Sequence, residues 1–299
     1  MKRPALHFVN SPKHLPPPPE TGRVVTLDLA FAAGRRYETA TRPFIEALGS
    51  RLVAWIDHHP HPAWAKYEDD PRFVLVDKAT APACPQLVTP ARVEAAGEVD
   101  HLFAHSDFDG FLSVVKWLRG GEEVWPGADE DARAIDAPGQ GYVCSARGQR
   151  IADAVARSRD AAPKKHEAFL CALADALVSG REPESVAHRI DSLAGELRAR
   201  RAQLEPLLED AEWDGDEVLV LRLGKMISPG DKKFVLQALE ERARVAVVEE
   251  PQSVTVATYD PSVPLTKLEA LHGTDGFAWG KATWSAVRGE LLALLRGSR

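Results

Sequence analysis

Three side chains that can bind a metal ion fall within five residues of one segment, "HSDFDG" at residues 105–110. In an extended chain, residues two positions apart point to the same side. His105, Asp107 and Asp109 can therefore converge on one point at the end of a strand. Gly110 would let a following helix begin close to that point, because glycine has no Cβ to clash.

A second group lies in "IDHHPHP" at residues 56–62, and Asp28 stands in "VTLDLA" at residues 25–30. Carboxylates and imidazoles without thiolates suit Mn²⁺ well, and Mg²⁺, Fe²⁺ or Zn²⁺ less distinctively. About six ligands leave room for two ions ~3.5–4 Å apart, bridged by one carboxylate. Such ions activate a water and neutralise charge on a phosphate, so the residue types alone indicate a two-metal phosphoesterase.

The elements that would position these residues are strands that alternate with helices. Each of four short apolar runs reaches an aspartate, at Asp28, Asp57, Asp77 and Asp107. The predicted strands are 23–30, 51–57, 72–77 and 100–107, and helical spacing appears at 41–50, 85–97 and 110–121. This alternation predicts a parallel sheet covered on both faces, whose strands end at one ligand-binding edge. Carboxylates gathered there would repel one another unless a cation lay between them.

The second half of the chain changes pattern twice. Residues 145–212 have apolar residues three and four apart and are predicted to be helical, whereas 213–299 again mixes strands and helices. Its strands are expected at 216–224, 243–251 and 253–260, and its helices at 231–241 and 281–297. We therefore expect an α/β protein with a proline-rich N-terminal arm (1–20), a parallel-sheet domain (21–144), a helical connector (145–212) and a smaller α/β domain (213–299).

Composition narrows the function classes. The net charge of −7 over 299 residues gives no global basic field for gripping long DNA. The three cysteines are far apart and form no CxxC, which argues against a thiolate zinc site or a disulfide framework. No signal peptide is evident and no run approaches the ~20 apolar residues of a membrane span, so we expect a cytoplasmic location and no membrane partner.

"IDHHPHP" and "HSDFDG" resemble the signature motifs of the DHH phosphoesterase family, which includes RecJ exonucleases, oligoribonucleases, cyclic-dinucleotide phosphodiesterases and pyrophosphatases. "HSDFDG" resembles the family's first motif, Asp28 its second, and "DHH" its third. The family places HxDxDG first, whereas here it follows "DHH" by about fifty residues. This order resembles a circular permutation, which is physically possible because ligands need to meet only in space.

The resemblance implies that residues 21–144 are the catalytic domain and that residues 213–299 are a substrate-binding domain. It also implies a role for each matching residue. His105, Asp107 and Asp28 would hold one metal, while Asp109, His58 and the bridging Asp28 would hold the other. His59 would face the scissile phosphate. Asp57 would orient a histidine, and the second ring nitrogen of His58 would be held by a carboxylate.

Three further positions are less distinctive. Asp136 in "ARAIDAPGQG" is our candidate for the family's last aspartate ligand, with an ordinary loop aspartate as the alternative. Asp77 is interpreted as a cap more than a ligand. His61 is expected to be a solvated neighbour of the site.

The segment "LHGTDGFAWGKATW" at 271–284 partly resembles a glycine-rich loop with which family members cradle a substrate phosphate. The predicted substrate-binding residues are His272, Gly273, Gly276, Gly280 and Lys281. A glycine-rich turn without a ligand is the alternative. Phe277 or Trp279 could stack on a base, or belong to the core.

The sequence thus predicts a hydrolase that uses two Mn²⁺ ions, with Mg²⁺ possible, and that cleaves a phosphodiester in a short oligonucleotide or nucleotide-like substrate. Two alternatives are kept: a pyrophosphatase or polyphosphatase, and a non-catalytic nucleotide sensor. The exact substrate, the polarity of cleavage and the oligomeric state stay open.

Overall fold

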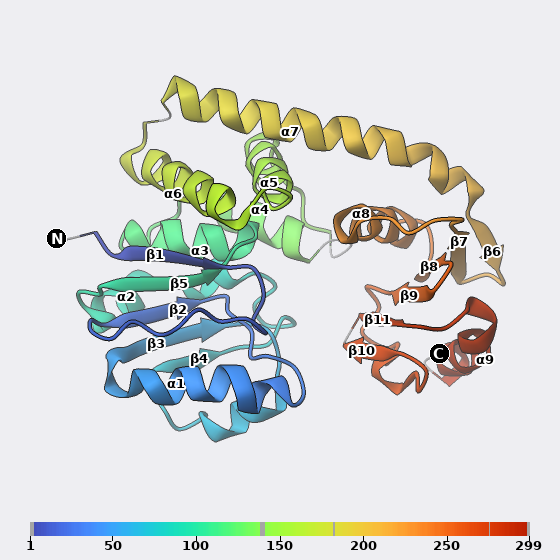
Figure 1. The fold of residues 1–299 in the computed structure, drawn as a ribbon, viewed down its shortest axis with the longest axis horizontal. Helices are drawn as coiled ribbons and strands as arrows, with labels where there is room; N and C mark the ends of the chain where they lie inside the picture. The colour runs from blue at the N-terminus through green and yellow to red at the C-terminus, as the bar shows by residue number, and fades with distance from the viewer. Residues whose placement is uncertain (1–2, 138–140, 182, 275, 298–299) are drawn as a thin grey trace. The chain divides into compact units, whose positions relative to one another are not determined.

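The computed structural model describes residues 3–137, 141–181, 183–274 and 276–297 (Figure 1). The chain forms two compact units. The first unit contains residues 3–137 and 142–197, and the second unit contains residues from 198 onward together with Gly141. Both units combine a sheet with helices, so the predicted α/β class is confirmed.

The first unit is built on five strands, all parallel, in the order β1-β5-β2-β3-β4. The strands are β1 (Ala5–Val9), β2 (Val24–Leu27), β3 (Leu52–Asp57), β4 (Phe73–Leu75) and β5 (His101–His105). The last four match the predicted strands. Strand β5 is late in the sequence but lies between β1 and β2, so its end meets the end of β2.

Strand β1 corrects the interpretation of the whole segment 1–20 as an extended arm. Its residues pair with β5 in register, from Ala5 opposite His101 to Val9 opposite His105. The run "ALHFV" precedes the prolines at 16–19 and retains its backbone N–H groups for pairing. The correction therefore concerns residues 5–9, which belong to the sheet.

Helices cover both faces of this sheet, as predicted (Figure 1). Helices α2 (Pro90–Ala96) and α3 (Phe108–Leu118) pack on one face, where Leu27, Ile56 and Leu102 are fully buried. Helix α1 (Arg42–Leu48) packs on the other. The expected helix at 85–97 is interrupted by a proline, and becomes a 3₁₀ turn at Cys84–Leu87 followed by α2.

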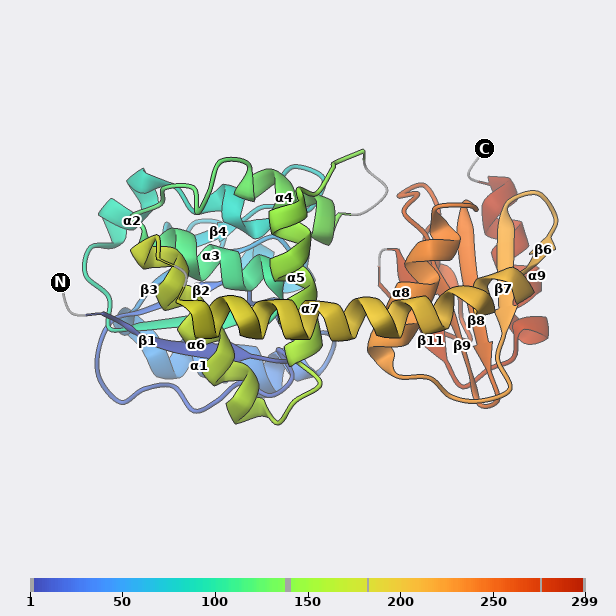
Figure 2. The ribbon, with the colours of Figure 1, turned by 90° about the horizontal axis from the view of Figure 1, so that it is seen from above.

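Four helices complete the region around α3. They are α4 (Ala128–Asp136), α5 (Ala146–Ser158), α6 (Pro163–Ser179) and α7 (Glu184–Leu204). Figure 2 shows α7 crossing α5 and α6, and residues of all three helices share one buried cluster with α3. The predicted connector is helical, and the boundary between the two units falls inside α7.

The second unit contains a six-stranded sheet in the order β10-β11-β9-β8-β7-β6. Its strands are β6 (Glu212–Asp214), β7 (Val218–Arg222), β8 (Val245–Glu250), β9 (Ser253–Ala257), β10 (His272–Thr274) and β11 (Phe277–Gly280). Among the described residues of this sheet, only β7 and β8 are paired in parallel. Helix α8 (Pro229–Glu240) covers one face and α9 (Trp284–Gly297) the other.

The segment expected to be a glycine-rich loop is an antiparallel hairpin formed by β10 and β11. A Cβ on Gly273 would lie 2.8 Å from the carbonyl oxygen of Leu265, and one on Gly280 would lie 2.8 Å from that of Ala270. Gly276 occupies the turn with a φ of +79°. These glycines are thus required by close backbone packing and by the turn, which sequence spacing did not reveal.

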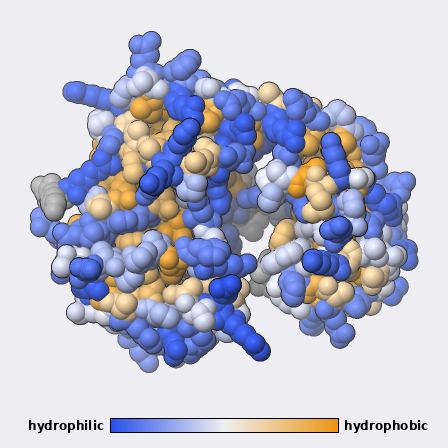
Figure 3. All heavy atoms as spheres, viewed as in Figure 1, coloured by the Kyte–Doolittle hydropathy of each residue, from blue (hydrophilic) through white to orange (hydrophobic). Residues whose placement is uncertain are grey.

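Hydrophilic side chains cover much of the visible face, while apolar residues gather in patches over both units (Figure 3). Among the described residues, no helix is long and apolar enough to span a bilayer.

Candidate metal centre

The carboxyl ends of β2, β3 and β5 bring the predicted ligands together. His58, which directly follows β3, has its Nε2 atom 3.2 Å from Asp28 Oδ1 and 3.2 Å from Asp109 Oδ2. Asp136 Oδ2 lies 3.6 Å from the same nitrogen. All four side chains come from different segments of the first unit, so the cluster exists only because the parallel strands end at one edge.

The backbone of Asp28 is held in a conformation that residues other than glycine rarely adopt. Its φ is +53°, and it is the only residue other than glycine with a positive φ among those described. The backbone N–H of Asp28 donates to Ile56 O at 2.8 Å, which anchors the residue to the end of β3. Such a conformation costs on the order of 1–3 kcal/mol and persists only when the surroundings impose it. With this backbone, the Asp28 carboxylate lies between His58 Nε2, at 3.2 Å, and His105 Nδ1, at 4.0 Å.

Two of the carboxylates, Asp107 and Asp109, lie at the start of α3. Asp107 caps the helix by accepting from Gly110 N at 3.2 Å, and its other oxygen lies 2.7 Å from His105 Nδ1. Both oxygens of Asp109 accept from Cys84 N at 3.1 Å. A backbone amide thus fixes the orientation of the Asp109 carboxylate. Gly110 allows close approach, because a Cβ there would lie 2.3 Å from His105 O.

A backbone carbonyl orients the ring of His58, which corrects the expectation that a carboxylate would hold it. The Nδ1 atom lies 2.8 Å from Ala81 O, so the Nδ1–H donates and the neutral ring presents a lone pair on Nε2. That Nε2 atom and both oxygens of Asp28 are buried without a hydrogen-bond partner. A lone pair facing carboxylate oxygens is repulsive unless a proton or a metal ion lies between them.

His59 points differently from its neighbour. Its Nδ1 donates to Asp57 Oδ1 at 2.8 Å, so Asp57 orients His59, and the two adjacent imidazoles meet at an interplanar angle of 80°. The His59 side chain is 33% exposed, whereas that of His58 is fully buried. His59 can therefore contact a molecule that arrives from solvent.

His61 belongs to the fold more than to solvent. It is half-buried, its Nδ1 accepts from Ala63 N at 3.1 Å, and its ring lies 5.3 Å from that of Tyr37. Asp77 is outside the cluster and accepts from Thr80 N at 2.9 Å, in agreement with its interpretation as a capping residue.

Lys78 is a site residue that the sequence analysis missed. Its Nζ lies 2.5 Å from Asp136 Oδ2, at the end of α4. Burial opposes the charged ammonium, but the carboxylates of Asp136, Asp109 and Asp28 outweigh it, so the pKa of Lys78 is raised. The only signal available was that Lys78 follows Asp77 at a strand end, and lysines in such loops are common.

The cluster perturbs the protonation of its members when no metal is bound. Burial, followed by repulsion from Asp109 and Asp107, raises the pKa of Asp28 well above its usual range. Burial disfavours a charged His58 ring, yet Asp109 and Asp28 overcome this and raise the pKa of His58 to about 11. In the metal-free protein the ring is therefore protonated at neutral pH and compensates part of the negative charge.

These donors fit divalent cations. Three groups have ligand atoms within 4.8 Å of one another: Asp28 with His58 and His59, Asp28 with His105 and Asp107, and His58 with Asp109 and Asp136. Asp28 belongs to two of them, as a bridging carboxylate would. The unpartnered buried oxygens of Asp28 and the lone pair of His58 are the observations that favour a cation.

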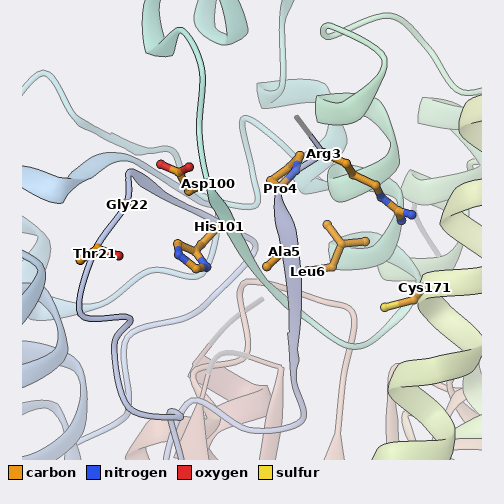
Figure 4. A pocket seen from close by; sticks show the side chains of 9 residues that line it. All are labelled: Arg3, Pro4, Ala5, Leu6, Thr21, Gly22, Asp100, His101 and Cys171. Atoms are coloured by element: carbon orange, nitrogen blue, oxygen red, sulfur yellow. The ribbon is translucent and has the colours of Figure 1, made fainter. Parts of the chain in front are cut away.

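The five residues predicted to bind substrate lie in the β10–β11 hairpin or directly after it, in the second unit. Their role in binding stays a prediction. A separate cavity of about 500 Å³ lies at the amino ends of β1 and β5, the opposite edge from the carboxylates (Figure 4). Leu6, Asp100, His101 and Cys171 are among its lining residues. The cavity is therefore not part of the candidate metal centre.

The chain is similar to solved structures that are distant in sequence. No family model and no curated protein matches the chain. Among solved structures, the chain is similar to exonuclease RecJ bound to manganese, with 16% identity, a TM-score of 0.42, and coverage of 92% of this chain and 75% of that one. It is also similar to the pGpG-specific phosphodiesterase PggH from Vibrio cholerae, with 11% identity, a TM-score of 0.45, and coverage of 92% of this chain and 98% of that one. A third similar structure is RecJ in complex with Mg²⁺ from Thermus thermophilus, with 15% identity, a TM-score of 0.37, and coverage of 93% of this chain and 49% of that one.

The close approach at Gly110 gives a first test. In Gly110→Ala the new Cβ must push away His105 O and Asp28, so we expect unfolding free energy to fall by about 1–3 kcal/mol and Mn²⁺ affinity to weaken. Gly195→Ala in α7 is the control, because beyond the helix's own backbone and the chain neighbours nothing lies within 4 Å of a Cβ at this position, and it should stabilise by about 0.5–1 kcal/mol. Denaturant unfolding and calorimetric titration measure both. Equal behaviour of the two variants would contradict the packing argument.

Metal binding should release protons, with a defined pH dependence. Because the pKa of His58 is about 11 without metal, its ring is charged at pH 7 and must lose that proton before Nε2 binds a cation. Affinity for Mn²⁺ should then rise with pH between roughly 6 and 8, by about tenfold per unit for each proton released. Calorimetry in buffers of different ionisation enthalpy counts the protons. Tight binding without proton release would exclude His58 as a ligand.

Lys78 should compete with the cation for Asp136. Lys78→Met removes the charge but keeps the length of the side chain. We expect a lower melting temperature in EDTA, and Mn²⁺ affinity tighter by about fivefold, the effect of ~1 kcal/mol from a lost like charge. Lys66→Met is the matched control, since Lys66 is exposed and pairs with Glu38 at 3.5 Å. Weaker Mn²⁺ binding in Lys78→Met would show that the sign of this argument is wrong.

Proposed function

We propose that this protein is a metal-dependent phosphoesterase of the DHH type, which hydrolyses a phosphodiester in a short oligonucleotide or nucleotide-like substrate with two divalent ions. The observation that carries the proposal is the convergence at one sheet edge of His58 Nε2 with the oxygens of Asp28 and Asp109, at 3.2 Å and without hydrogen-bond partners for Asp28 or His58 Nε2. A proton on His58 offsets part of this buried negative charge, and a divalent cation among the carboxylates would offset more of it.

The ligand assignment uses two of the three groups of donors. His105, Asp107 and Asp28 would hold one ion, and His58, Asp109 and Asp136 the other. Asp28 would bridge the two ions, because its Oδ1 lies 3.2 Å from His58 Nε2. Bound there, the ions would activate a water and offset charge on the phosphate. We favour Mn²⁺ because the donors mix imidazole with carboxylate, and Mg²⁺ is the alternative.

The remaining residues act on the substrate or on one another. Asp57 holds His59 through Nδ1, which leaves Nε2 of a one-third exposed ring to contact a phosphate oxygen. Ala81 O and Cys84 N orient His58 and Asp109 from one loop. These ligands are thus fixed before substrate arrives, and preorganisation of this kind favours catalysis.

A permuted motif order is part of the proposal. Because β5 lies between β1 and β2, "HSDFDG" reaches Asp28 although it follows it by about eighty residues. A non-catalytic sensor would be free to lose metal ligands during evolution. The predicted ligands instead all belong to groups that could hold a metal ion, which favours an enzyme over a sensor. A phosphoanhydride substrate would be hydrolysed at the same centre, so a hydrolysis experiment is needed to distinguish it from a phosphodiester.

The substrate class is tested by hydrolysis of a panel with Mn²⁺ and, separately, Mg²⁺. The panel contains five-residue RNA and DNA, cyclic dinucleotides, pyrophosphate and polyphosphate. We expect turnover of short oligonucleotides or dinucleotides, and about two Mn²⁺ per chain by metal analysis of the reconstituted protein. Hydrolysis of pyrophosphate alone would replace the diesterase assignment. A folded protein that binds no metal would exclude both enzymes.

The three histidines of "IDHHPHP" should differ in effect. His59→Ala should leave metal stoichiometry and fold intact but lower kcat by ~10²-fold or more, the scale of a lost transition-state contact. His58→Ala should weaken metal affinity. His61→Ala removes a cap and should cost only ~1 kcal/mol of stability without a change in kcat. Similar mild effects from all three changes would mean that the segment is not catalytic.

A further inference from the structure

One lysine of the first unit is buried although it is not part of the candidate metal centre. Lys116 in α3 is 6% exposed, and it is the only buried lysine or arginine among the described residues. Its Nζ donates to Pro85 O at 2.9 Å and also pairs with Asp129 in the first turn of α4. A buried ion pair often adds little net stability, because removing both charges from water costs free energy. Stability alone therefore does not explain why a lysine occupies this position.

Lys116 attaches the 3₁₀ turn that contains Pro85 to α3. The turn does not need this lysine for its own shape, because Pro85 O also accepts from Val88 N at 3.1 Å. The same turn contacts α3 a second time, since both oxygens of Asp109 accept from Cys84 N at 3.1 Å. The turn is therefore held on α3 at two points: one at the metal centre, through Asp109, and one at Lys116.

The spacing of charged residues along α3 and α4 shows how these two points are related. Asp109 and Lys116 are seven residues apart in α3, and Asp129 and Asp136 are seven residues apart in α4. Seven residues are almost two helical turns, so each pair lies along one face of its helix and spans about 10 Å. The metal centre takes Asp109 from α3 and Asp136 from α4, and Lys116 joins the same two helices about 10 Å further along.

This arrangement affects how the carboxylates are held when no metal ion is bound. Asp109 and Asp136 have ligand atoms within 4.8 Å of one another, and like charges at this separation repel. Repulsion would move α3 and α4 apart. Lys116 opposes that movement, because its buried ammonium would lose the carboxylate of Asp129. Ligands that are already in place bind an ion more tightly, since less conformational entropy is lost on binding.

We propose that Lys116 is a positioning residue for the candidate metal centre. Its ammonium joins the turn at Pro85, helix α3 and helix α4, and it thereby holds Asp109 and Asp136 close together before a divalent ion binds. This inference rests on the proposed function for the identity of the bound ion, but the attachment that it describes can be measured without metal. An apolar side chain at this position could fill the same volume, yet it would leave the turn detached from α3 at this point.

The test uses the full-length double variant Lys116→Met/Asp129→Asn, which removes both charges and so leaves neither partner of this pair buried alone. In EDTA, the backbone amides of residues 81–88 should exchange hydrogen faster than in the wild type, as measured by mass spectrometry. Mn²⁺ affinity, measured by calorimetry, should fall by about 10-fold or more, the range for lost contacts that orient metal ligands. Lys232→Met/Glu250→Gln is the matched control, because it removes the ion pair of the buried Glu250 in the second unit. The control should bind Mn²⁺ like the wild type.

The outcomes separate this inference from the proposed function. If the double variant equals the wild type in Mn²⁺ affinity, the positioning role of Lys116 is overturned, whether or not amide exchange is faster, and the metal centre stands. An equal loss of Mn²⁺ affinity in the control would also overturn it, because the loss would then reflect general destabilisation. Faster exchange in the double variant, together with no Mn²⁺ binding by the wild type, would support the role of Lys116 in holding the acids and reject the proposed function.

Discussion

Carboxylates buried side by side repel one another, and the first unit holds Asp28, Asp109 and Asp136 around a single imidazole. This repulsion is the constraint on which the rest of the unit depends. A sequence selected only for stability would expose these acids to solvent or would have uncharged residues in their place. The chain instead keeps them buried, accepts a left-handed backbone at Asp28, and leaves both oxygens of that residue without hydrogen bonds. Local cost of this kind is typical of a site that binds something.

The surrounding elements are arranged to hold the acids in place against this repulsion. The loop between β4 and α2 makes three contacts with the cluster: Lys78 pairs with Asp136, Ala81 O accepts from His58, and Cys84 N donates to Asp109. Helix α3 begins at the cluster, where its first backbone N–H groups favour negative charge. One loop and one helix start therefore orient most of the site, while the sheet beneath them supplies the rigid edge.

The second unit has a different organisation. Its mixed sheet is sandwiched between α8 and α9, and its hydrophobic clusters account for the buried side chains of β7, β8 and β9. On β11, Trp279 is 40% exposed, because the buried cluster beneath α8 contains no described residue of that strand.

Much of this arrangement was predictable from the sequence by itself. Four apolar runs that reach an aspartate, alternating with helical spacing, determined the parallel sheet, and parallel strands end at the same edge, so the convergence of Asp28, His58 and Asp107 followed. Strand β1 escaped this reasoning, because a five-residue edge strand before four prolines has too little pattern to distinguish it from an extended arm.

Other features were decided only by the tertiary structure. Lys78 reaches Asp136 across 58 positions, and Ala81, rather than a carboxylate, holds His58. These contacts depend on how a loop folds over the sheet edge. Because every residue has a backbone carbonyl, the sequence does not indicate which carbonyl will accept a hydrogen bond from His58. The hairpin of β10 and β11 was hidden for a related reason. Glycines that a loop would use for flexibility are required here for close backbone packing. Whether Trp279 is buried depends on how far α8 extends over the sheet, and the periodicity along one strand does not encode that distance.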